Sequence, residues 1–246
     1  MRVAVAGGTG SVGRLVVAEL RAAGHEPVVL ARSEGIDLTS GDGLAERIAG
    51  CAAVIDVSNV TTTRGKPSIE FFTKVTGHLI DAVREAGDCR LIALSIVGID
   101  RVDYGYYLGK RAQEKLISAS GVRWTILRAT QFFEFPQSML LGHRFPIAPV
   151  PRMLCQPVAA ADVAKELVGL LDFEPSGRTI QLAGPEKLPM AEMARRIERA
   201  RGSRRPVLSF PMPGKAGRGM AHGGLVPQGE YVTGERSFAD YLAGLR

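Results

Sequence analysis

The first thirteen residues of the chain constrain its fold more than any other segment. The apolar run Val3–Ala6 leads directly into Gly7-Gly8-Thr9-Gly10-Ser11-Val12-Gly13, and the amphipathic stretch Leu15–Leu20 follows. This order is typical of a short strand, a glycine-rich turn and a helix. Glycine tolerates positive φ and lets main chains approach closely, because it has no Cβ. The start of the chain therefore predicts a strand-turn-helix unit with bare backbone at the turn.

Such a turn is suited to hold a diphosphate. Backbone N–H groups at the start of the helix would face the phosphate oxygens, and the helix dipole would favour their negative charge. Gly8, Gly10 and Gly13 have the spacing of the dinucleotide-binding motif, in its expected place between a strand and a helix. We expect a dinucleotide here, contacted by Gly7, Gly8, Thr9, Gly10, Ser11, Val12 and Gly13.

Short apolar segments alternate with helical patterns along most of the chain, which is typical of βαβ units. After the first strand we expect strands at Pro27–Leu30, Ile36–Leu38, Ala53–Val57, Leu91–Leu94 and Trp124–Leu127. Helices are expected at Leu44–Ala49, Ser68–Ala86 and Tyr106–Ser120. The strands are apolar on both faces, as strands covered by helices on both sides must be. The sequence predicts an α/β fold with a doubly wound parallel sheet of the Rossmann type.

The alternation loosens after residue 130 and returns briefly in Asp162–Leu171 and Thr179–Leu182. We expect one nucleotide-binding domain over residues 1–246, with its core in 1–130 and 157–183. Residues 131–156 and 184–246 would form a small C-terminal lobe that contacts substrate. The lobe is expected over the carboxyl ends of the strands, where such folds bind their ligands.

Composition excludes several other function classes. No apolar run approaches the ~18 residues of a membrane span, and a strand starting at residue 2 leaves no room for a leader, so we expect a cytoplasmic protein. Cys51, Cys89 and Cys155 have no metal-ligand spacing, and no metal site is expected. The net charge is +6, but glutamates interrupt the arginine-rich stretch 195–205. This predicts a solvated helix surface and no nucleic-acid partner. A small-molecule substrate is the expected partner, and a homodimer is left open.

The residues after the second strand bear on which dinucleotide binds. An acid at this place usually meets a free ribose 2′-hydroxyl, whereas an arginine meets a 2′-phosphate. Here Arg32 and Ser33 occupy the place. A guanidinium can hold a phosphate through two parallel hydrogen bonds, so we favour NADP over NAD. Topology would place Asp37 near the adenine, and Val57 and Ser58 beside the ribose.

Three further residues have the pattern of a catalytic set. Ser95 ends an expected strand, and Tyr106 and Lys110 are spaced i, i+4 on one face of an expected helix. A nearby ammonium would lower the pKa of a phenol, and it would also hold the nicotinamide ribose. Tyr106 would donate a proton to the reacting oxygen, and Ser95 would orient that oxygen. Tyr107 is an alternative phenol, because i, i+3 spacing also approaches Lys110.

These residues resemble the short-chain dehydrogenase/reductase superfamily, and more closely its atypical NmrA-like branch of NAD(P)H-binding proteins. The resemblance covers nearly the whole chain. It is carried by Gly7–Gly13, Ser95–Asp100, Tyr106–Lys110 followed by Glu114, Thr125–Phe133, Gln156–Val158 with Asp162–Ala164, and Leu182–Glu186. The resemblance implies an NADP-binding Rossmann core, with Lys110 as a ribose ligand and Thr130, Gln131 and Phe132 beside the nicotinamide. Tyr106 and Ser95 correspond to the catalytic tyrosine and serine of the superfamily.

Two functions follow from these residues, and a third, epimerisation of a nucleotide sugar on the same scaffold, is disfavoured because the C-terminal half shows no obvious sugar-nucleotide anchor. The first is an NADP-dependent oxidoreductase that transfers hydride to a carbonyl or quinone-like group of a small apolar substrate. The second is a protein that binds NADP(H) as a redox sensor or regulator without turning it over, as some members of the NmrA-like branch do. The sensor needs the glycine-rich turn and Arg32, but it does not need Tyr106.

Overall fold

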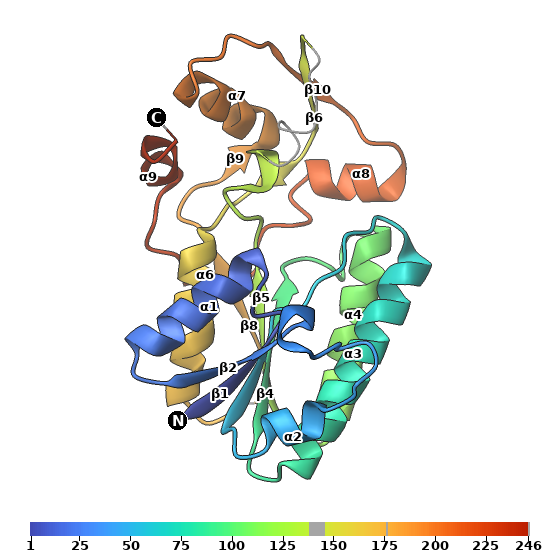
Figure 1. Cartoon of the computed structure of the whole chain (residues 1–246). Helices are drawn as coiled ribbons and strands as arrows, with labels where there is room; N and C mark the ends of the chain where they lie inside the picture. The colour runs from blue at the N-terminus through green and yellow to red at the C-terminus, as the bar shows by residue number, and fades with distance from the viewer. Residues whose placement is uncertain (138–145, 176, 246) are drawn as a thin grey trace. The chain divides into compact units, whose positions relative to one another are not determined.

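The computed structural model describes residues 1–137, 146–175 and 177–245, and it divides into two compact units (Figure 1). The first unit comprises Met1–Ser95, Tyr104–Arg128 and Val163–Ile180. The second unit comprises Ile96–Asp103, Ala129–Asp162 and Gln181–Arg246. Within the predicted C-terminal lobe, residues 138–145 lie outside the described part of the chain. The role of this lobe in binding substrate stays a prediction.

Seven strands of the described residues form the central sheet, in the order β11-β8-β5-β4-β3-β1-β2. They are β1 (Arg2–Ala6), β2 (Glu26–Leu30), β3 (Ala53–Asp56), β4 (Arg90–Ile96), β5 (Arg123–Ala129), β8 (Thr179–Ala183) and β11 (Val232–Thr233). The pairs β1 with β2, β1 with β3, β3 with β4, and β8 with β11 are all parallel. The predicted parallel sheet is confirmed.

The central strands are buried on both faces. In β1 the four residues from Val3 to Ala6 are 0% exposed, and every residue of β3 is buried. Figure 1 shows α1 (Ser11–Ala22) and α6 (Ala160–Gly169) on one face of the sheet, with α3 (Gly65–Glu85) and α4 (Gly105–Ala119) on the other. Both faces of a strand must then be apolar, as the sequence pattern requires. The doubly wound arrangement is confirmed.

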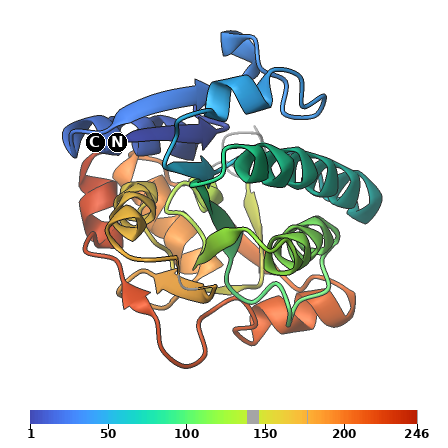
Figure 2. The same ribbon diagram turned by 90° about the horizontal axis from the view of Figure 1, so that it is seen from below.

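The helix α3 shows how an apolar stripe positions an element. Its buried residues Phe72, Val75, Leu79 and Val83 recur at intervals of three or four, and this spacing brings them to one face. That face packs into the core, while the other face is solvated. Figure 2 shows α3 and α4 lying side by side. The short helix α2 (Leu44–Ile48) precedes β3 and buries Leu44 and Ile48.

The strand predicted at Ile36–Leu38 is wrong. After β2 the chain forms a short 3₁₀ helix at Arg32–Glu34 and then a turn, with no strand before α2. Ile36 and Leu38 are buried in the core, but Asp37 between them accepts hydrogen bonds from the amide and hydroxyl of Thr39. An aspartate that bonds the backbone two residues on favours a turn. The alternation of apolar and polar residues here reflects a buried turn, so β3 is the third strand along the chain.

The strand order sets where a ligand can bind. From β1 the chain moves outward to β2, and it then crosses back to β3 on the other side of β1. In open α/β sheets such a reversal leaves a crevice at the carboxyl ends of the two diverging strands, and ligands bind there. The glycine-rich turn after β1 and residues 57–59 after β3 lie at this reversal.

The second unit has small sheets and its own helices. Besides β11, its elements include β6 (Ala148–Pro151) paired in parallel with β10 (Val207–Phe210), β7 (Leu154–Cys155) paired in antiparallel fashion with β9 (Leu188–Pro189), and the helices α7 (Met190–Ala200), α8 (Gly214–Ala221) and α9 (Phe238–Ala243). The ring of Phe133 packs at 5.4 Å from that of Phe238 and 5.6 Å from that of Tyr241. These aromatic residues form core in this unit.

Charges on α7 are partly paired within the helix. Glu192 forms ion pairs with Arg195, Arg196 and Arg199, at distances of 3.6, 3.1 and 3.3 Å. This pairing fits the solvated helix surface that the sequence predicted. Across the described ranges, none of the helices combines the length and the apolar composition needed to cross a membrane.

Candidate functional site

The glycine-rich turn leaves bare backbone at the carboxyl end of β1. Gly7 has a φ of +79°, which disfavours any residue with a Cβ. Its amide donates to the carbonyl of Leu30 at 3.0 Å, and the amide of Gly10 donates to the carbonyl of Gly7 at 2.9 Å. A Cβ on Gly7 would lie only 2.9 Å from the Cα of Ser58. The turn is therefore packed directly against the end of β3.

Gly13 fixes the approach of α1 to this turn. A Cβ at this position would lie 2.1 Å from the carbonyl oxygen of Gly7 and 2.7 Å from the Cα of Gly8. Only glycine lets the helix approach the turn this closely, which is the packing role of the last glycine in the dinucleotide-binding motif. Gly10 caps α1 without a side-chain hydrogen bond, and the first amides of a helix have no partner within it. These amides, from Ser11, Val12 and Gly13, fit an anionic ligand.

Arg32 and Ser33 are exposed immediately after β2. Within the described ranges, the Arg32 guanidinium forms no hydrogen bond or ion pair, so its donors are available to a ligand. Asp37, predicted near the adenine from a strand that does not form, instead accepts two hydrogen bonds from Thr39, at 2.8 Å and 2.7 Å. These bonds, together with the nearby charge of Arg32, lower the pKa of Asp37. The carboxylate of Asp37 is thus occupied in holding its own turn.

Val57 and Ser58 follow β3 as predicted, beside the glycine-rich turn. Ser58 is buried, and its amide donates to Asp56 Oδ1 at 2.9 Å. The residue after them was missed by the sequence analysis. Asn59 Oδ1 accepts a hydrogen bond from the amide of Val60 at 2.8 Å and another from the hydroxyl of Tyr106 at 2.6 Å. Since a backbone N–H can only donate, the shared atom of Asn59 is its oxygen.

Tyr106 thus directs its hydroxyl proton to Asn59. The expected lowering of its pKa by Lys110 is wrong in this geometry. Burial raises the pKa of Tyr106 above its ordinary value, and the negative charge of Asp56 raises it further. The physical reason is that the Lys110 ammonium donates elsewhere, to the carbonyl of Leu94 and to Gln113 Oε1, at 2.9 Å each. Sharing a helix face did not bring the ammonium to the phenol.

Lys110 is buried, with only 4% of its surface exposed. Its ammonium lies 4.3 Å from the centre of the Phe72 ring, a cation–π distance. Burial lowers the pKa of Lys110 to about 8, although the charges of Asp56 and Glu114 oppose this shift. The ammonium form is therefore present at neutral pH. It lies at the carboxyl end of β4, because the carbonyl it binds belongs to Leu94.

Ser95 follows Leu94 at this strand end. Its side chain is 2% exposed, and its Oγ has no hydrogen-bond partner among the residues that the structure describes. A buried hydroxyl without a partner is costly, and native structures usually provide one. This orphaned hydroxyl fits a site that a ligand completes.

Lys110 is linked through Gln113 to Asp56 by buried hydrogen bonds, and the sequence analysis also missed this network. Gln113 Nε2 donates to Asp56 Oδ2 at 2.8 Å, while its Oε1 accepts from Lys110. Asp56 and Gln113 are each 1% exposed, and burial raises the pKa of Asp56 despite the opposing charge of Lys110. An aspartate ending a buried strand was the one signal that could have pointed to this network. The spacing of Lys110 and Gln113 alone carries no such meaning.

Tyr107, the alternative phenol, has its ring 5.3 Å from that of Tyr104 and 6.0 Å from that of Tyr106. The hydroxyl of Tyr106 reaches Asn59, just after β3. This contact supports Tyr106 as the phenol at the strand ends.

Thr130, Gln131 and Phe132 belong to the second unit. The hydroxyl of Thr130 donates to the carbonyl of Gln156 at 2.6 Å, and Gln131 Nε2 donates to the carbonyl of Leu225 at 3.1 Å. Phe132 is half-buried. These contacts hold the segment after β5 in one conformation. Its predicted place beside the nicotinamide stays a prediction.

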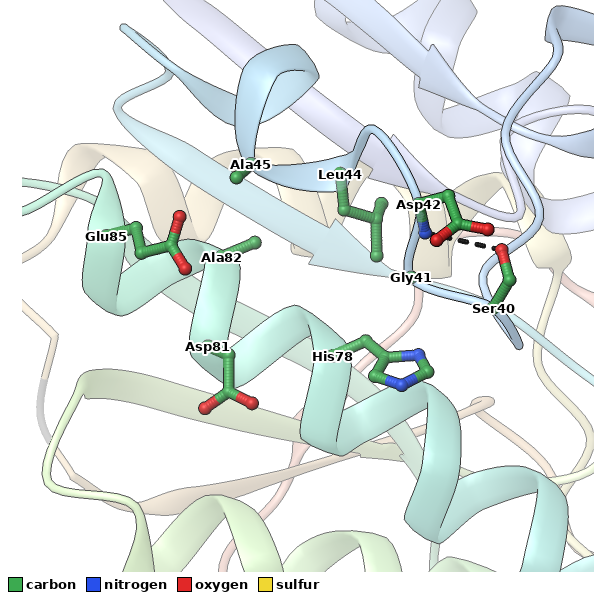
Figure 3. Close-up of a pocket in the computed structure, with 9 residues that line it drawn as sticks. All are labelled: Ser40, Gly41, Asp42, Leu44, Ala45, His78, Asp81, Ala82 and Glu85. Carbon is green, nitrogen blue, oxygen red and sulfur yellow. Dashed lines mark hydrogen bonds between the residues drawn. The ribbon is translucent and has the colours of Figure 1, made fainter.

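The structure also has a shallow pocket of about 200 Å³ away from these residues (Figure 3). Its lining comes from the segment 40–45 and from one face of α3, where His78, Asp81 and Glu85 lie. The ring of His78 bonds the carbonyl of Leu38 at 3.0 Å, so it holds the buried turn after β2. None of the predicted site residues lines this pocket, and it shares no group with the set at the strand ends.

Curated relatives of the chain include two proteins of different kinds. One is a (4-alkanoyl-5-oxo-2,5-dihydrofuran-3-yl)methyl phosphate reductase of Streptomyces griseus, 28% identical over 220 residues, which cover 81% of this chain and 74% of the relative. The other is the photosystem II assembly factor Ycf39 of Synechocystis, 25% identical over 240 residues, which cover 86% and 71%.

The fold also matches solved structures. A short-chain dehydrogenase/reductase superfamily protein from Agrobacterium tumefaciens, with bound NAD, superposes with a TM-score of 0.73 over 100% of this chain and 96% of the other, at 19% identity. The fold expected from the resemblance is thus confirmed. Residues 35–173, more than half of the 246, match the family described as NAD(P)H-binding. Together with the glycine-rich turn that precedes this match, the finding shows that the chain belongs to the NAD(P)H-binding family.

Proposed function

We propose that this protein is an NADP-dependent oxidoreductase of the short-chain dehydrogenase/reductase type. It reduces a carbonyl or quinone-like group of a small apolar substrate. One observation carries the proposal: the buried Lys110 ammonium and the unpartnered Ser95 hydroxyl lie at the carboxyl end of β4, and the Tyr106 hydroxyl reaches Asn59, just after the neighbouring strand β3. The glycine-rich turn lies at the neighbouring end of β1, which is the edge where such folds bind dinucleotides.

The residues present fit the cofactor. The bare backbone of the turn and the amides that start α1 would hold the diphosphate. The Arg32 guanidinium would hold the 2′-phosphate, and this residue supports NADP over NAD. Lys110 has three donors, and Leu94 and Gln113 use two of them, which leaves one for the ribose hydroxyls. When bound, the reduced nicotinamide supplies a hydride to the substrate.

Ser95 and Tyr106 would act on the substrate oxygen. The unpartnered Ser95 hydroxyl would donate a hydrogen bond to this oxygen and orient the carbonyl. Tyr106 would give its proton to the same oxygen as negative charge develops there. A phenol with a raised pKa keeps its proton at neutral pH, and an alkoxide is basic enough to take it. Lys110 thus serves the cofactor in this proposal, and the Tyr106 hydroxyl exchanges its bond to Asn59 for one to the substrate oxygen before it gives up its proton.

The reducible group of the proposed substrate, but not its apolar character, is supported by the relative from Streptomyces griseus. The name of that enzyme describes a methyl phosphate of an unsaturated lactone with an adjacent alkanoyl group, and this conjugated carbonyl is electron-poor. Compounds of this kind accept hydride readily, as quinones do. A panel for this protein should therefore contain quinones, aldehydes and acylated unsaturated lactones.

Replacing the proposed proton donor tests the mechanism. We expect NADPH oxidation, followed by absorbance, with at least one compound of the panel. Tyr106→Phe should lower kcat by about a hundredfold or more, because general acid catalysis is lost, while the Kd for NADPH stays within about twofold. Tyr107→Phe is the matched control and should retain turnover. Unchanged turnover in Tyr106→Phe would remove this residue from the mechanism, and loss in Tyr107→Phe alone would transfer the role to its neighbour.

A second function is favoured by the same hydrogen bonds. The Tyr106 hydroxyl and two of the three Lys110 donors are committed to residues of the chain, and the curated relative from Synechocystis is named as an assembly factor. A sensor that binds NADP(H) and passes its redox state to a partner needs no proton donor. Tight NADPH binding without oxidation across the whole panel would favour this function over the reductase.

A further inference from the structure

We propose that Gln113 and Asp56 are positioning residues that hold the Lys110 ammonium at the end of β4, with its remaining N–H available to the cofactor ribose. The proposal rests on the function proposed above, which assigns Lys110 to the cofactor. It concerns residues that the sequence pattern did not indicate.

All three side chains are removed from water. Asp56 and Gln113 are 1% exposed, and Lys110 is 4% exposed. Taking a carboxylate and an ammonium out of water costs several kcal/mol for each ion unless hydrogen bonds replace the lost hydration. A carboxylate and an ammonium used only to stabilise the fold would gain most from direct contact. Here an amide lies in the hydrogen-bonded chain from the carboxylate to the ammonium.

The direction of the bonds through Gln113 is determined. An ammonium can only donate, so the atom facing Lys110 is Oε1. The other amide atom, Nε2, then donates to Asp56 Oδ2, and the amide of Ser58 donates to Oδ1 of the same carboxylate. Asp56 thereby fixes the orientation of the Gln113 amide, and the amide presents an acceptor to Lys110.

This arrangement confines the ammonium from three sides. Gln113 Oε1 and the carbonyl of Leu94 each accept from Lys110 Nζ at 2.9 Å, and the ring of Phe72 lies 4.3 Å from it. The ammonium is thus held beside the peptide bond that joins Leu94 to Ser95. Its charge stays at the strand end, where the proposed ribose contact is made.

The helix α4 makes this possible by its period. Tyr106, Lys110 and Gln113 are separated by four and three residues, which brings them to one face of the helix. Asp56 occupies the last position of β3, so its carboxylate meets the same face from the sheet. One helix face therefore holds the proposed donor, the ribose ligand and the residue that positions the ligand.

A double-mutant cycle tests the coupling. We expect Lys110→Met to weaken NADPH binding about tenfold, measured by cofactor fluorescence. Gln113→Met, which keeps the volume but removes the acceptor, should cause most of this loss. In the Lys110→Met background, Gln113→Met should change the Kd by less than about twofold, because its effect acts through the ammonium. Ile117→Val, which trims a fully buried residue of the same helix, controls for loss of packing and should leave the Kd unchanged.

Other outcomes would overturn the proposal. An equal loss from Gln113→Met in both backgrounds would mean that the residue only supports the fold. No loss from Gln113→Met while Lys110→Met is impaired would remove Gln113 alone and leave the proposed function standing. If Gln113→Met does not fold, Gln113→Asn keeps a neutral amide but withdraws it from Lys110 by one methylene, and it should weaken binding in the wild-type background only.

A readout without cofactor separates this proposal from the proposed function. NMR titration of lysine labelled with ¹⁵N at Nζ follows Lys110 directly, even in a protein that binds no NADPH. Gln113→Met should lower the pKa of Lys110, since the ammonium loses an acceptor in a buried place. An unchanged pKa would contradict the positioning role whatever the cofactor result. Absence of NADPH binding by the wild type would contradict the proposed function instead.

Discussion

At the scale of single residues, Lys110 shows how a buried charge is adjusted. Removal from water disfavours its charged form and lowers its pKa to about 8, while the negative charges of Asp56 and Glu114 act in the opposite sense. The group that also faces the strand ends from α4, Tyr106, has its pKa raised by burial and so stays neutral in this range. Lys110 is therefore the group of this cluster expected to change charge just above neutral pH.

This leads to a pH dependence of cofactor affinity. If the ammonium donates to the ribose, cofactor binding raises the pKa of Lys110, and the affinity for NADPH is greatest below pH 8. The affinity should weaken as the pH rises from about 8, the pKa of Lys110 in the free protein, to its higher pKa in the complex. Between these two pKa values the Kd should rise about tenfold for each pH unit. Cofactor fluorescence titrations at several pH values measure this. Lys110→Met should bind more weakly and without this slope, whereas an equal slope in the variant would exclude Lys110 as its source.

The roles of individual residues could be predicted only in part. Helical spacing correctly indicated that Tyr106 and Lys110 share a face of α4, because the period of an α-helix places residues i and i+4 on the same face. It could not indicate which acceptor the ammonium would choose, since Leu94 and Gln113 compete for it in three dimensions. Asn59 was missed for the same reason. A single asparagine after a strand gives no sequence signal of a hydrogen bond to a tyrosine 47 positions away.

At the scale of elements, the strand-turn-helix unit at residues 2–22 depends on backbone contacts so close that they leave no room for a methyl group on Gly13. The helix α1 approaches the preceding turn at Gly13, where a Cβ would meet only backbone atoms. Backbone cannot move aside as a flexible side chain can, so the helix would have to shift. The amides that start α1 would move with it.

Gly13→Ala should therefore lower both stability and cofactor affinity. Overpacking of this kind costs about 1–3 kcal/mol, and we expect a lower Tm together with at least tenfold weaker NADPH binding. Gly77→Ala is the matched control, because it lies within α3 with nothing within 4 Å of the added Cβ. This control should be neutral or slightly stabilising, since alanine is the better helix former. Wild-type behaviour of Gly13→Ala in both assays would contradict the close packing of α1.

The elements themselves were largely predictable from periodicity. The helix expected at Ser68–Ala86 forms as Gly65–Glu85, and the strand expected at Leu91–Leu94 forms as Arg90–Ile96. Long amphipathic runs and buried strands leave clear periods because one face or both must be apolar. The strand predicted at Ile36–Leu38 was wrong because three residues are too few to distinguish a strand from a turn with two buried side chains.

At the scale of the whole molecule, the sequence predicted the class of fold but not the exact order of the strands in the sheet. Alternating strands and helices allow few arrangements other than a parallel sheet with helices on both faces. Without a strand between β2 and β3, β2 lies at one end of the sheet, beside β1. The turn after β1 still lies at the reversal of strand order. The match of residues 35–173 to the NAD(P)H-binding family agrees with this class of fold.

We propose that the turn after β1 binds a dinucleotide and that Arg32 selects the 2′-phosphate. Isothermal titration calorimetry with NADPH and NADH, on the wild type and on Arg32→Ala, measures both properties. We predict binding of NADPH at least about tenfold tighter than NADH, and loss of this preference in Arg32→Ala, as removal of charge-assisted hydrogen bonds requires. Tighter binding of NADH by the wild type would contradict the role of Arg32, and no heat with either nucleotide would contradict the account as a whole.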